Sequence, residues 1–163
     1  MTDTTSTKRG ERIAADLEAI NARVAAAIEG CTDELWTRQT AAEGWPVGVV
    51  AHHMAEVQRF FAGVLASVGS GGVPTALTSA FIDENNARHA QAAAGVGKDE
   101  TLALFRSAGA DAARALRGLD DARLDAIAVE IDGQGLTAAQ AAEFGLVGHF
   151  EEHLASIQAT LSA

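Results

Sequence analysis

The chain has 163 residues, of which 48% are apolar, and its 22 acidic and 12 basic side chains give a net charge of −10. Nucleic-acid binding requires clustered Lys and Arg, and the sequence has no such cluster. No stretch approaches the roughly 20 apolar residues that span a bilayer, and the N-terminus lacks the apolar core of a secretion signal. We therefore expect a soluble cytoplasmic protein, with residues 1–163 forming a single domain.

Two segments in the first half of the chain carry the apolar spacing of an amphipathic helix. The first covers residues 13–28, where apolar side chains recur every three or four positions, and Gly30 provides a stop. The second begins near Pro46, a residue suited to a first helical turn, and ends at the Ser-Gly-Gly break of residues 70–72.

The second half of the chain predicts a short helix over residues 81–93 and a longer one over residues 102–119. The last helix opens at Thr137, whose spacing to Gln140 fits a capping box, and runs to Leu161. An alanine-rich sequence with few aromatic residues favours helices over a sheet. We expect an all-α fold: a four-helix bundle with a short extra helix between bundle helices 2 and 3.

His149 and His153 lie four residues apart on the last predicted helix. This spacing places both imidazoles on one helix face, close enough to reach a single metal ion. Leu146 and Ile157 share that face, which indicates that the pair points inward or into a cleft. Taken alone, the pair fits surface histidines equally well.

A third histidine ligand should come from the inner face of another helix. His53 shares its stripe with apolar residues on either side, whereas His52 shares a face with Glu56 and Arg59, the predicted solvent side. We therefore predict His53, with His149 and His153, as the ligands of a divalent metal ion. Three imidazoles leave at least one coordination position for water or substrate, as in catalytic sites.

Two other metal motifs are disfavoured by the sequence. Residues 149–153 match the H-x-x-E-H pattern of inverted zinc peptidases. Those enzymes need an acidic ligand downstream, and no acidic residue follows His153. No E-x-x-H pair of the type used in di-iron bundles is present either.

Three segments resemble the DinB-like superfamily, in order and over nearly the whole chain. In residues 45–56, Trp45 precedes His53 by eight positions, as a tryptophan precedes the metal histidine of that superfamily. Residues 148–157 resemble its final helix, which supplies the other two ligands, and residues 82–88 resemble its middle segment more loosely. The polar helix-capping residue that is common in the family is replaced here by Pro46, and a second histidine, His52, stands beside the expected ligand.

The resemblance implies a four-helix bundle with a three-histidine metal site at one end. It also implies thiol chemistry, since the better-understood members are transferases and isomerases that use mycothiol or bacillithiol, and mycothiol-dependent maleylpyruvate isomerase shares the fold. We therefore expect a divalent metal ion as cofactor, with zinc or nickel best suited to three imidazoles. The expected partners are a small thiol and an electrophilic substrate. A homodimer is expected only because homodimers are the commonest oligomers of soluble proteins.

Other residues give weaker signals. Glu152 lies one turn from His149 and is our candidate catalytic base or ligand-orienting residue, although such glutamates are more often solvated. Glu56 lies in a similar position relative to His53. Asn85 and Asn86 could line a cleft, although a helix-cap or turn role is more common for such residues. We interpret Cys31 as a small buried residue and His89 as a surface residue.

The leading function is therefore a metal-dependent small-thiol transferase or isomerase, in which the ion lowers the pKa of the thiol. Two alternatives remain: a hydrolase that activates water at the ion, and a non-catalytic metal- or ligand-binding protein. Thiol chemistry predicts a roomy pocket beside the ion. Hydrolysis predicts a tighter pocket with a positioned carboxylate.

Overall fold

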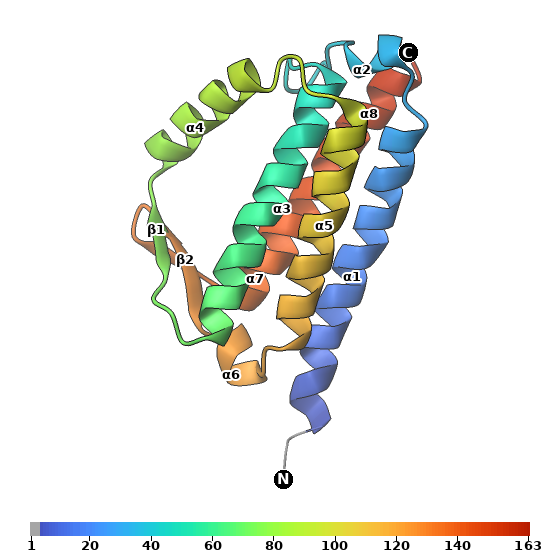
Figure 1. The fold of residues 1–163 in the computed structure, drawn as a ribbon. Coiled ribbons are helices and arrows are strands. Elements are labelled where there is room, and N and C mark those ends of the chain that lie inside the picture. Colours follow the sequence, from blue (N-terminus) through green and yellow to red (C-terminus); the bar gives the residue numbers. More distant parts are fainter. Residues whose placement is uncertain (1–3) are drawn as a thin grey trace.

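Four long helical segments form a bundle in the computed structural model, which describes the backbone of residues 4–163 and the side chains of residues 9–163. Residues 1–3, part of the N-terminus in which no secretion signal was found, lie outside this range. The bundle helices are α1 (Thr4–Glu29), α3 (Val47–Gly69), α5 (Lys98–Arg117) and the C-terminal run of α7 (Ala138–Ala142), η1 (Glu143–Gly148) and α8 (His149–Leu161). Helix α5 packs against α1 and α3, and α8 closes the bundle against the same two helices (Figure 1).

The core of the bundle is built from the apolar stripes that the sequence predicts. In α1, Ile13, Leu17 and Val24 are at most 1% exposed, and Phe105 of α5 and Phe150 of α8 meet with ring centroids 5.8 Å apart. Burial of large apolar side chains is the main stabilising contribution in such a bundle. The predicted all-α four-helix bundle is confirmed.

Three short helices connect the long ones: α2 (Asp33–Trp36), α4 (Ser79–Ala92) and α6 (Asp121–Leu124). Helix α4 is the predicted extra helix between bundle helices 2 and 3, and the Thr78 side chain caps it by accepting a hydrogen bond from the Phe81 amide. It lies outside the bundle, on the far side of α3 from α1 (Figure 1). Residues of α3 and α4 line a shared cavity.

A small three-stranded sheet adds to the predicted bundle. Strand β2 (Ile127–Ile131) pairs in parallel with β1 (Thr75–Leu77) and antiparallel with β3 (Gln134–Thr137). No strand was expected from the sequence. The β2–β3 hairpin turns at Asp132 and Gly133, which both have positive φ (50° and 79°), as a tight two-residue hairpin requires. A local turn signal and β-branched neighbours therefore outweighed the helical bias of the composition.

The C-terminal helix begins with the predicted capping box. The Thr137 side chain accepts a hydrogen bond from the Gln140 amide, and the Gln140 side chain accepts one from the Thr137 amide. After α7 the helix widens into one π-helical stretch, η1, immediately before His149. Within residues 4–163, no helix is both long and apolar enough to cross a bilayer. The single-domain boundaries and the homodimer stay predictions.

Candidate metal centre

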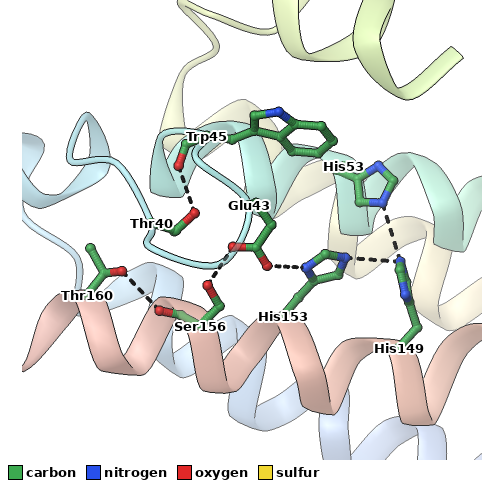
Figure 2. A network of polar contacts seen from close by, with 8 residues as sticks. All are labelled: Thr40, Glu43, Trp45, His53, His149, His153, Ser156 and Thr160. Atoms are coloured by element: carbon green, nitrogen blue, oxygen red, sulfur yellow. Dashed lines mark hydrogen bonds and ion pairs between the residues drawn. The ribbon is translucent and has the colours of Figure 1, made fainter. Parts of the chain in front are cut away.

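Three histidine side chains from two helices converge beside the bundle. The Nε2 atom of His149 lies 3.3 Å from Nε2 of His53 and 3.1 Å from Nε2 of His153. Ring nitrogens of all three residues lie within 4.8 Å of one another, so each can offer one nitrogen to a single ion. Figure 2 shows His149 and His153 rising from consecutive turns of α8 toward His53 on α3. The structure thus brings together the three predicted ligands.

Glu43 orients the imidazole of His153. Its Oε1 atom lies 2.8 Å from His153 Nδ1, and its Oε2 atom accepts a hydrogen bond from Ser156 Oγ at 2.5 Å (Figure 2). The side chains of His153 and Glu43 are only 12% and 14% exposed. Burial by itself raises the pKa of Glu43, but hydrogen bonds from Ser156 and His153 outweigh it and the pKa lies below its usual value. The ionised carboxylate accepts a hydrogen bond from the Nδ1–H group of His153, which leaves the Nε2 lone pair of His153 facing the other histidines.

The loop before α3 carries Glu43 to this position. The Thr40 amide donates to the Trp45 carbonyl at 2.8 Å, the Gly44 amide donates to the Thr40 carbonyl at 3.0 Å, and Gln39 and Pro46 form a short bridge. Gly44 has a φ of 69°, a conformation that favours glycine, directly after Glu43. The tight turn therefore presents the carboxylate to α8, 110 residues further along the chain.

His53 and His149 lie in surroundings that favour their neutral forms. Burial, with smaller contributions from the neighbouring histidines His153 and His149, lowers the pKa of His53 from 6.5 to about 3. Burial also lowers the pKa of His149, to about 4, with a contribution from His153. Neutral imidazoles are the form that binds metals. The donor set and the orientation of His153 by a carboxylate both fit a divalent metal ion, zinc and nickel included.

A cavity of about 700 Å³ opens beside this cluster, with His53 and His149 in its wall. The other walls come from α3, α4, η1 and the sheet, and include Phe60, Phe81 and Phe144. Small-molecule sites commonly have volumes of about 300–1,000 Å³. The histidine cluster therefore has a ligand-sized space next to it.

Comparison with known proteins decides the family. Residues 17–154 match the family model described as the mycothiol maleylpyruvate isomerase N-terminal domain. The chain belongs to this family. The family is part of the DinB-like superfamily, so the resemblance recognised in the sequence is confirmed. A search of curated proteins and a search of solved structures each gave no match.

In this family member, further aromatic and imidazole rings lie around the histidine cluster. Trp45 stands edge-on to His53, with ring centroids 5.6 Å apart (Figure 2). His52 is half-buried, stacks on His89 with centroids 5.1 Å apart, and its Nδ1 lies 2.8 Å from His89 Nε2. His52 and His89, which were expected on the solvent side and at the surface, are thus both partly buried against each other, because α4 folds back over α3.

The candidate carboxylates lie differently from the sequence expectation. Glu152 is on the exposed side of α8, and its predicted catalytic role stays a prediction. Glu56 lines the cavity and forms an ion pair with Arg59 at 2.5 Å. Glu43, which the sequence analysis missed, is the carboxylate in contact with His153. Only its position two residues before Trp45, at the edge of the recognised segment, marked it in the sequence.

Proposed function

We propose that this family member is a metal-dependent enzyme that uses a small thiol, mycothiol or bacillithiol, for S-transfer or isomerisation. The observation that carries the proposal is the convergence of three histidines, two of which line a ligand-sized cavity. Membership of a family described by a mycothiol-dependent isomerase domain supports the choice of thiol.

His53, His149 and His153 would hold the ion, with zinc or nickel as the best-suited metals. Glu43 keeps the proton of His153 on Nδ1 and so keeps its Nε2 atom available. When bound, a divalent ion stabilises the deprotonated form of a thiol and supplies a nucleophile at neutral pH.

The chain's own cysteine is poorly suited to act as the nucleophile. Cys31 is 2% exposed, and its Sγ donates to the carbonyl of Thr32. Burial raises the pKa of the Cys31 thiol, so it stays protonated at neutral pH. A thiol supplied from solution fits better, and a cavity of about 700 Å³ is large enough to admit one.

The hydrolase alternative has less support. Hydrolysis at a metal needs a carboxylate free to activate water. Of the two carboxylates near the cluster, Glu43 is held by His153 and Ser156, and Glu56 is paired with Arg59. The roomy cavity likewise favours thiol chemistry over the tighter pocket expected of a hydrolase.

Cobalt substitution gives a direct test of thiol binding. We expect mycothiol or bacillithiol, added to the Co(II)-loaded protein, to produce an intense sulfur-to-cobalt charge-transfer band in the near ultraviolet. His149→Ala should abolish the band, because the ion is then lost or misplaced. An unchanged spectrum with both thiols, together with turnover of ester or amide substrates, would make the hydrolase the better assignment. A spectrum of a closed four-ligand site without any turnover would indicate a binding protein.

A further inference from the structure

Three exposed phenylalanines line the cavity beside the histidines. Phe60, Phe81 and Phe144 come from α3, α4 and η1, and they are 39%, 49% and 64% exposed. Scattered exposed apolar residues are common, but a contiguous group that lines a concave surface marks a binding site. All three rings line the same cavity, so they are exposed to a space that a ligand can fill.

The inner walls of the cavity are apolar too. Val129 is 1% exposed, and together with Ile131 and Leu77 it forms the wall contributed by the sheet. Phe61, which also lines the cavity, packs against Gly145, where a Cβ atom would lie 2.7 Å from the Phe61 ring. The π-helical stretch η1 thus brings its backbone close to α3 while Phe144 stays at the cavity.

The acidic and basic side chains of the cavity lining neutralise each other. Of the side chains that carry a full charge at neutral pH, the lining contains Arg59 and Glu56. These two form an ion pair with each other at 2.5 Å. Recognition of a carboxylate ordinarily uses an Arg or Lys free to pair with it. Apart from the proposed ion, the described residues of the lining therefore offer an anionic ligand no free cationic side chain. Asn85 and Asn86 of α4 provide uncharged polar groups at the same cavity.

We infer that this cavity binds an uncharged, largely apolar electrophile, with a ring or alkyl body between the phenylalanines and a neutral polar group such as a carbonyl. The inference rests on the proposed thiol chemistry, whose second substrate it specifies. The electrophile then lies beside His53 and His149, which share the cavity wall, and so beside the place where the thiol would be held.

A fluorinated enone provides a probe of binding without reaction. 4-Fluorobenzylideneacetone is uncharged, and Cys31 is too buried to react with it when no thiol is added. Its ¹⁹F signal should broaden on addition of the Zn(II)-loaded protein, and its relaxation should be several-fold faster with the Co(II)-loaded protein, because the paramagnetic ion lies next to the cavity. Equal relaxation with the two metals would overturn the inference.

Two exposed apolar residues provide a matched pair of variants. Phe144→Ser removes a ring from the cavity and, at 64% exposure, leaves the core intact, so we expect at least fivefold weaker binding of the enone. Val73→Ser removes an exposed apolar side chain, 85% exposed, which is absent from the lining of the cavity, and should leave binding within twofold. Equal affinities for the parent and Phe144→Ser would overturn the inference.

An anionic analogue tests the charge selectivity. 4-Fluorocinnamate has a similar ring and a carboxylate in place of the ketone. We expect it to bind the chelator-treated protein, in which no ion attracts the carboxylate, at least tenfold more weakly than the enone binds the same protein. Binding as tight as that of the enone would overturn the inference. The cobalt–thiol band is measured without any electrophile, so failure of the thiol proposal and failure of the electrophile proposal give different results.

Discussion

A carboxylate beside a metal-binding imidazole fixes which ring nitrogen carries the proton. Glu43 does this for His153, and Ser156 in turn fixes the carboxylate. We expect Glu43→Gln to weaken zinc binding about 10–100-fold, the usual effect of removing such a partner. Isothermal titration calorimetry with ZnCl₂ measures the change. Glu152→Gln is the matched control, since Glu152 is exposed on α8, and should bind zinc like the parent. The opposite order of affinities would mean that Glu152 is the supporting carboxylate.

The buried histidines make the stability of the metal-free protein depend on pH. Burial holds the pKa of His53 at about 3 and that of His149 at about 4, against 6.5 ordinarily. Below pH 6.5 the unfolded chain gains protons at these residues and the folded chain does not. The contribution of the two histidines to the free energy of unfolding is therefore fully present above pH 6.5 and is lost as the pH drops toward 4. The slope is up to about 1.4 kcal/mol per pH unit for each histidine.

Urea unfolding of the chelator-treated protein between pH 7.5 and 5 measures this dependence. The double variant His53→Gln with His149→Gln should show a flatter profile over the same range. Parallel profiles for the parent and the double variant would show that these two side chains are not held neutral by the fold.

At the scale of elements, α3 is the helix that both packs the bundle and carries His53. Gly48 lies in its first turns against the indole of Trp36, and a Cβ atom there would be 2.5 Å from the ring. The Trp36 Nε1 atom donates to the Val96 carbonyl at 2.9 Å, which holds the indole in place. We expect Gly48→Ala to destabilise the protein by about 1–3 kcal/mol through overpacking.

Gly63 of the same helix is the control for this effect. A Cβ atom at Gly63 meets nothing within 4 Å, so Gly63→Ala should stabilise the protein by up to about 1 kcal/mol through helix propensity. Chemical denaturation of both variants gives the two free energies of unfolding. Similar effects at the two positions would contradict the close packing of Trp36 on α3.

At the scale of the whole molecule, the three histidines connect α3 to the C-terminal helix. An ion bound by the folded state alone stabilises it, by about 2.7 kcal/mol when its free concentration is 100 times Kd. We expect zinc to raise the Tm of the parent protein and of His52→Gln, but not of His53→Gln. Differential scanning fluorimetry with and without ZnCl₂ tests this. A zinc effect retained in His53→Gln and lost in His52→Gln would place the ligand one residue earlier on α3.

Residue spacing along single helices was enough to predict the bundle and its three histidines. The four-residue interval between His149 and His153, and the apolar stripe around His53, are local properties of the sequence. The sequence also held a local signal for the β2–β3 hairpin in Asp132-Gly133, between residues with alternating apolar side chains. The hairpin was not predicted because the alanine-rich composition favoured helices.

Contacts between distant segments were decided by the tertiary structure alone. Glu43 meets His153 across 110 residues, and β1 pairs with β2 across more than 50, without any local pattern that links the partners. The cavity likewise exists because α4 and the sheet fold back over α3 beside η1. Periodicity determines which face of an element is apolar. Which faces meet depends on loop geometry and packing, and these fixed the supporting carboxylate and the shape of the cavity.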